Sequence, residues 1–171
     1  VDYDQNSPIT KQFYAHVQDK LHYAIHGQTS AELIAKRADA SKPNMGLSTF
    51  KNAKTGGKVT KLDVTVGKNY LDQKEIEGLN RLVSMYLDYA ENFARRQILM
   101  KMQDWPEKLN SFLSFNEYPV LENYGSTRRE TAEKRALSEY EKFRVVQDKE
   151  FKSDFDRIVD EVRINKKLPK S

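Results

Sequence analysis

The stretch DQKEIEGLNRLVSMYLDYAENFARRQILMKM, residues 72–102, contains the longest regular apolar pattern in the chain. Asp72 and Glu75 have the spacing of a capping box, in which each side chain accepts a backbone hydrogen bond at the start of a helix. Apolar residues then recur at the period of one helix face, at Ile76, Leu79, Leu82, Val83, Tyr86, Leu87, Ala90, Phe93, Ala94 and Ile98. The stretch predicts one long central helix that buries a single face.

Two helices are predicted upstream of this central helix. Ser7 and Pro8 are typical of a helix start and Gly27 of a helix end. Between them one apolar stripe repeats at Ile9, Phe13, Tyr14, Val17, Leu21, Ala24 and Ile25. Thr29 and Glu32 form a second capping box, which predicts a short helix that reaches about Arg37.

Two more helices are predicted downstream. Asp104 and Pro106 suit a helix start with Trp105 as a packing anchor, and Pro119 ends the segment. Its predicted buried face is Leu109, Phe112, Leu113 and Phe115. A last long helix is predicted from about Ser126, with an apolar face at Ala132, Ala136, Tyr140 and Phe143.

An apolar stripe continues beyond the body of this last helix. Apolar side chains keep helical spacing between acids and bases, at Phe151, Phe155, Ile158, Val159 and Val162. A stripe of this kind packs on another helix. We therefore expect residues 150–171 to form a projecting helix and tail, and we expect homo-oligomers through this C-terminal helix.

The segment between Asp39 and Asn69 has a different composition, rich in Gly, Ser, Thr and Lys. It is too long for a structureless connection in a compact domain. Leu62, Val64 and Val66 alternate as in a half-buried strand, and 55–57 suits a hairpin tip. The predicted fold is therefore mainly α, one domain over 1–171 with about five helices, two of them long, and a basic loop or β-hairpin insertion between helices two and three.

Composition restricts the classes of function. The chain has 29 lysine and arginine residues against 25 acids, so its net charge of +4 is by itself a weak argument for nucleic acid. There is no cysteine, which excludes disulfides, thiolate zinc sites and thiol nucleophiles. The sequence contains no apolar run long enough for a membrane span and no signal segment at its start. These features predict a cytoplasmic protein with no membrane partner.

Signatures of common enzyme classes are also missing from the sequence. There is no G-x-x-x-x-G-K-[ST] loop, no G-x-G-x-x-G and no G-x-S-x-G. The three histidines all precede Arg37, the first arginine, which excludes helical ribonucleases that place a histidine shortly after an arginine. No cofactor is therefore predicted.

Several runs together resemble one known family. They are KLHYAIHGQTSAELIAKRADASKPNMGL (20–47), DVTVGKNYL (63–71), LNRLVSMYLDYAE (79–91) and MQDWPEKLNSFL (102–113). These runs resemble the C-terminal region of the RhuM virulence-protein family of bacteria, with a likeness that extends from about Phe13 to Phe143. The resemblance implies a bacterial chain that follows an N-terminal part similar to DNA-binding domains. With no Met at its start, the sequence is expected to be a piece of such a longer protein. The resemblance supplies no catalytic residues.

The run RADASKPNMGL, residues 37–47, is the most distinctive part of this resemblance. A structural interpretation is that Asp39 or Ser41 caps a turn, Pro43 stiffens it and Gly46 supplies a positive φ. This interpretation leaves two cations and an amide unexplained, and such groups suit a phosphate or carboxylate. The predicted ligand-binding residues are Arg37, Asp39, Lys42 and Asn44.

The insertion carries five lysines and one acid between Lys51 and Lys68, which is Asp63. Mobile cations suit the phosphates of a nucleic acid, although lysine-rich loops are also simply soluble. The predicted nucleic-acid-binding residues are Lys51, Lys54, Lys58, Lys61 and Lys68. Possible stacking partners are Phe50 and Tyr70, if they are exposed.

His22 and His26 are spaced one helical turn apart, on a face that points away from the apolar stripe of their helix. This spacing suits a divalent metal, but no E follows His22 in an H-E-x-x-H motif, so we expect no metal site here. The alternatives are that the two histidines pack against another part of the protein or are exposed to solvent.

We hypothesise an interaction or effector module that binds nucleic acid or another anionic partner. The alternative is an enzyme acting on nucleic acid or a phosphate-containing substrate, with His22, His26 and Asp39 as catalytic candidates beside the 37–47 loop.

Overall fold

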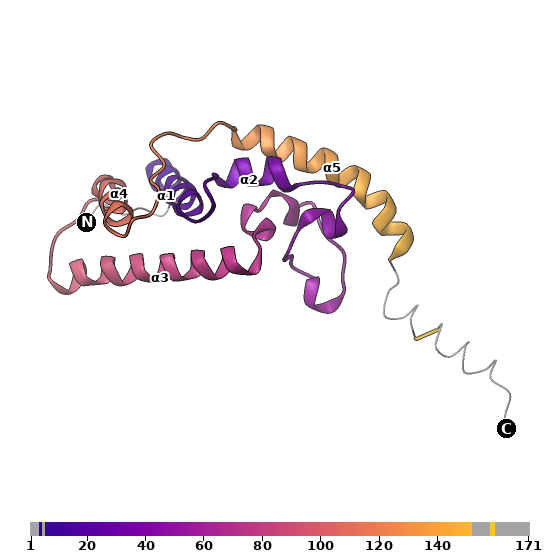
Figure 1. Cartoon of the computed structure of the whole chain (residues 1–171), viewed down its shortest axis with the longest axis horizontal. Helices are drawn as coiled ribbons and strands as arrows, with labels where there is room; N and C mark the ends of the chain where they lie inside the picture. Colours follow the sequence, from indigo (N-terminus) through magenta and orange to yellow (C-terminus); the bar gives the residue numbers. More distant parts are fainter. Residues whose placement is uncertain (1–3, 5, 152–157, 160–171) are drawn as a thin grey trace, which may run out of the picture.

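The computed structural model describes residues 4, 6–151, 158 and 159 (Figure 1). The described part contains five α-helices and no β-strand, which confirms a mainly α fold. The α-helices are α1 (Pro8–His26), α2 (Ser30–Arg37), α3 (Gln73–Arg95), α4 (Trp105–Phe115) and α5 (Arg129–Glu150). Short 3-10 turns connect them: η1 (Pro43–Gly46), η2 (Ala53–Thr55), η3 (Asp63–Thr65), η4 (Gly67–Tyr70) and η5 (Met102–Asp104).

The long helices α3 and α5 run along opposite sides of the molecule (Figure 1). α1 packs on α3 and α4 at one end, and α2 packs along α5. The core is formed by buried apolar side chains from all five α-helices and from the insertion, among them Leu21, Leu33, Ile34, Met45, Val64, Leu82, Leu109, Leu113 and Ala136. No helix in the described part is both long and apolar enough to cross a bilayer.

Both predicted capping boxes are present. The side chain of Thr29 accepts from the backbone N–H of Glu32, and that of Asp72 accepts from Glu75. Gly27 has the left-handed φ of +70° that the sequence predicts at the end of α1. Local sequence therefore determines where α1 ends and where α2 and α3 begin.

Some predicted helix faces and ends are wrong. α3 ends at Arg95, because the chain then turns through Gln97 at a φ of +54°. Phe115, predicted as buried, is 87% exposed. At 100° per residue it points about 120° away from Leu109, outside the buried face of α4. Four other predicted core positions are also exposed: Tyr14, Leu87, Ala94 and Ile98.

The β-hairpin alternative for the insertion is wrong. The segment 53–70 contains the three 3-10 turns η2, η3 and η4 and no strand. Val64 is buried, but Leu62 is 80% exposed and Val66 is 44% exposed. The three alternating apolar residues therefore do not share the one buried face that a strand would give them. The loop alternative is therefore the correct one.

A buried carboxylate organises the insertion. Asp63 is 6% exposed, and it accepts hydrogen bonds from the backbone N–H of Lys51 at 3.0 Å and of Thr60 at 2.8 Å. α5 holds the same segment through Gln147, whose side chain bonds both the N–H and the carbonyl of Val59. Polar side chains thus replace the ladder of backbone bonds that a hairpin would have supplied.

Candidate functional site

Arg37, at the last position of α2, already has an anionic partner inside the molecule. Its guanidinium donates to both carboxylate oxygens of Glu75, each at 2.6 Å, and to the carbonyl of Tyr70 at 2.7 Å. The hydrogen bonds from Arg37 lower the pKa of Glu75 to about 2. Arg37 therefore joins the end of α2 to the start of α3, and an external ligand would have to compete with Glu75.

The turn after Arg37 follows the structural interpretation of the sequence. The Asp39 carboxylate accepts from the backbone N–H and the hydroxyl of Ser41, at 2.9 and 2.6 Å. Gly46 has a φ of +80°, and a Cβ at this position would lie 2.5 Å from the carbonyl oxygen of Arg37. Met45 also has a positive φ, and its side chain is completely buried. The turn is therefore anchored to the core.

Two predicted ligand residues of this turn remain on the surface. Lys42 and Asn44 are exposed, and Lys42 has only a loose ion pair, with its Nζ 4.0 Å from an Asp39 oxygen. A ligand-binding role for these two residues stays a prediction.

His22 and His26 form a pair inside the fold. The Nδ1 of His22 lies 3.1 Å from the Nε2 of His26, and the side chain of His22 is 2% exposed. Burial, and then the charges of His26 and Lys68, lower the pKa of His22 to about 4, and burial also lowers the pKa of His26. The pair occupies a packed surface. The described residues include no cluster of three or more His, Asp or Glu side chains that could hold a metal ion.

The structure separates the histidine pair from most of the 37–47 loop. His26 interacts electrostatically with Glu75 and Arg37. Asp39 instead interacts with Arg135 of α5, and the N–H of Ala40 next to it donates to a side chain of α5. Among the predicted site residues of the loop, Arg37 is thus the one that the structure brings near His26.

The five predicted lysines of the insertion fall into two groups. Lys58 and Lys61 form ion pairs with acids of α5, Asp148 and Glu141, each at 2.8 Å. Exposed lysines with no ion pair to any described residue form the other group, Lys51, Lys54 and Lys68. The predicted stacking residues are poorly placed, because Tyr70 is 1% exposed and Phe50 is half-buried.

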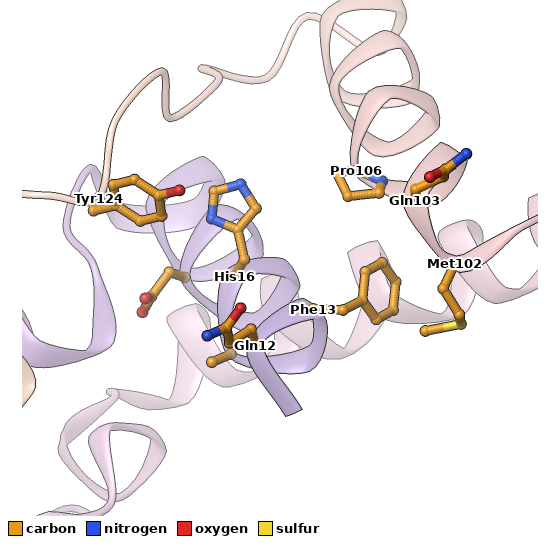
Figure 2. Close-up of a pocket in the computed structure, with 9 residues that line it drawn as sticks. Gln12, Phe13, His16, Met102, Gln103, Pro106 and Tyr124 are labelled. Carbon is orange, nitrogen blue, oxygen red and sulfur yellow. The ribbon is translucent and has the colours of Figure 1, made fainter. Parts of the chain in front are cut away.

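A groove that the sequence analysis missed lies between α1, the start of α4 and the segment before α5 (Figure 2). We call it the His16 groove; its volume is about 590 Å³ and its lining is Gln12, Phe13, Ala15, His16, Asp19, Met102, Gln103, Pro106 and Tyr124. Figure 2 shows the rings of His16 and Tyr124 beside each other, with centroids 5.6 Å apart. Tyr124 lies more than a hundred residues from His16 in the chain, so sequence spacing gave no signal for this contact.

Two titratable groups of the His16 groove are shifted toward their neutral forms. Burial, and then the charge of Lys20, lower the pKa of His16. Burial raises the pKa of Asp19, whose carboxylate accepts from the backbone N–H of Ser30 at 3.1 Å. Perturbed groups in a groove are typical of ligand-binding and catalytic sites, and also of structural networks.

The burial of the histidine pair should make the free energy of unfolding depend on pH. Because folding lowers the pKa of His22 from 6.5 to about 4, the unfolded chain binds more protons between these values. The stabilisation is complete above pH 6.5 and is lost as the pH falls toward 4, by about 3 kcal/mol for His22. Chemical denaturation at several pH values should show this loss, and His22→Gln should reduce it. An unchanged pH dependence in His22→Gln would contradict the burial of a neutral imidazole here.

Comparison with protein families identifies the chain. The model of the virulence protein RhuM family matches residues 1–152, which include all five α-helices. Comparisons with curated proteins and with solved structures return no significant match. Since the family model covers most of the sequence, including the 37–47 turn, the resemblance seen in the sequence is confirmed. The chain belongs to the virulence protein RhuM family.

Proposed function

We propose that this chain is an interaction module that contacts the phosphates of nucleic acid, in the bacterial cytoplasm, through the insertion between α2 and α3. The observation that carries the proposal is the group of exposed lysines that form no ion pair with any described residue, Lys51, Lys54 and Lys68. The one acid between Lys51 and Lys68 is Asp63, which is buried and hydrogen-bonded to the backbone. Of these three lysines, Lys51 is the one whose charge acts on the Asp63 carboxylate. The insertion therefore exposes positive charge.

The anchoring of the insertion supports this proposal. Gln147 and the ion pairs of Lys58 and Lys61 attach the segment to α5, and Asp63 fixes its turns. A segment that is already ordered loses little backbone entropy when a partner binds. Phosphate contacts then require ordering of the lysine side chains alone, and they need no fixed geometry.

The salt dependence of DNA binding tests the proposal. Each phosphate contact on duplex DNA contributes roughly 0.9 to the slope of log K against log salt. Substituting Lys51, Lys54 and Lys68 together by Ala should therefore reduce the slope by about 2 to 3. Fluorescence anisotropy with a short mixed-sequence duplex measures this change.

A matched control variant distinguishes the loss of these particular lysines from the loss of net charge. Substituting Lys11, Lys36 and Lys134 by Ala removes the same charge from exposed positions outside the insertion. This control should keep most of the slope. Equal losses in the two variants would reject the insertion as the contact surface, and absence of binding by the unchanged chain would reject the proposal altogether.

A second candidate function is the binding of a flat, uncharged group in the His16 groove. The observation that favours it is the largely apolar lining, with the rings of Phe13, His16 and Tyr124 and the amides of Gln12 and Gln103. Aromatic faces stack on planar groups, and amides hydrogen-bond to their edges. For an enzyme, this groove is a better place than the His22–His26 pair, because His22 is buried and its Nδ1 lies 3.1 Å from His26.

Nuclear magnetic resonance titration with adenosine and with indole tests this second function. Resonances of His16 and Tyr124 should shift at about millimolar ligand, a range typical of weak single-group binding. Tyr124→Ala should abolish the shifts. Phe115→Ala, which removes an exposed aromatic ring of α4 outside the lining, should leave them intact. Shifts that persist in Tyr124→Ala would rule out the groove as the binding place.

A further inference from the structure

A second groove, at the junction of α3 and α4, is apolar and open. It has a volume of about 490 Å³, and we call it the α3–α4 groove; its lining is Ala90, Phe93, Ala94, Gln97, Ile98, Leu99, Met100, Met102 and Trp105. Leu99 is 83% exposed and Ile98 is 37% exposed. Large apolar side chains clustered at an open groove are typical of a surface that packs against another chain.

Positive charge surrounds the α3–α4 groove. Arg96 caps α3 and Lys101 precedes η5, and both are exposed. The Nζ of Lys108 lies 5.7 Å from the ring centre of Phe93. Of the nearby acids, Glu91 pairs with Arg95 and Asp104 accepts from the backbone N–H of Lys101, while Glu107 in the first turn of α4 is exposed. An occupant of this groove should therefore combine an apolar face with negative charge.

The chain itself contains a segment with this chemistry. The sequence EFKSDFDRIVDEV, residues 150–162, has five acids and two bases, and its apolar residues keep helical spacing. Of the described residues of this apolar stripe, Ile158 is 59% exposed. Phe151 is 36% exposed, and the Nζ of Lys58 lies 4.7 Å from the centre of its ring. Of the stripe predicted from the sequence, Phe155 and Val162 lie outside the described residues.

We propose that the segment 150–162 of one copy binds in the α3–α4 groove of a second copy. The contact must form between copies, because α5 ends at Glu150, at the end of the molecule opposite to α4 and the last turn of α3 (Figure 1). Apolar side chains of the segment pack on Phe93, Leu99 and Trp105, and its acids face the cations around the groove. This proposal goes beyond the contact with nucleic acid and does not depend on it.

The geometry of the contact determines the type of assembly. A segment of one copy binds a different surface of the next copy, so the interface is heterologous. After one such contact, one copy still has a free groove and the other still has a free segment. Such contacts produce rings or open chains rather than only closed dimers. Pairing of the C-terminal segment with itself would instead give a dimer in which the groove has no part.

Mixing of two variants of the full chain tests the proposal. Leu99→Glu should prevent the α3–α4 groove from binding the segment. Phe155→Glu with Ile158→Glu should prevent the segment 150–162 from binding in the groove. Each variant alone should weaken self-association at least about tenfold, as expected when a central apolar contact is lost. A mixture should form a one-to-one heterodimer, since one copy supplies an intact groove and the other an intact segment. Analytical ultracentrifugation over a range of concentrations measures both results.

Leu62→Glu is the matched control, because Leu62 is 80% exposed and lies outside the groove. It should associate as the unchanged chain does, and circular dichroism should show equal helix content in all variants. Reversal of charge by Arg96→Glu with Lys101→Glu should also weaken association at least about tenfold at low salt. The proposal is overturned if the unchanged chain stays monomeric, if Leu99→Glu associates normally, or if the mixture remains monomeric.

Discussion

The bidentate ion pair between Arg37 and Glu75 is the contact on which the rest of this structure depends. Arg37 ends α2, Glu75 lies in the first turn of α3, and the guanidinium also bonds the carbonyl of Tyr70 at the end of the insertion. Three elements therefore meet at one side chain. Glu75 also completes the capping box of α3 by accepting from the N–H of Asp72 at 2.9 Å, so the pair and the helix start support each other.

This pair brings together the two ends of the segment 38–72. Some charged side chains of this region are paired inside the fold, and others remain on the surface. Arg37, Lys58 and Lys61 have carboxylate partners in the fold, and Asp63 binds backbone. On the surface remain Lys51, Lys54 and Lys68, which have no ion pair within the described part of the chain and lie on an ordered segment. The proposed contact with nucleic acid uses these lysines, whereas the groove of the proposed contact between copies lies at the opposite end of the molecule.

The helical part of the fold could be predicted from the sequence, because a helix is encoded by local period and by end signals such as Thr29 and Asp72. The insertion could not, since alternation at Leu62, Val64 and Val66 does not distinguish a strand from 3-10 turns built around a buried carboxylate. The site was predicted only in part. The sequence singled out Arg37 and the lysines as charges, but their partners on α3 and α5 are distant in the chain. The His16 groove depends on Tyr124 for the same reason, and no local pattern indicates such a contact.

A double-mutant cycle on Arg37 and Glu75 tests the central claim most directly. Free energies of unfolding are measured by chemical denaturation for the unchanged chain, Arg37→Met, Glu75→Gln and the double variant. If the pair joins α2, the insertion and α3, the coupling energy should be about 2 kcal/mol or more, within the range found for contacting charged groups. A coupling energy below about 0.5 kcal/mol, the level of independent sites, would contradict the claim.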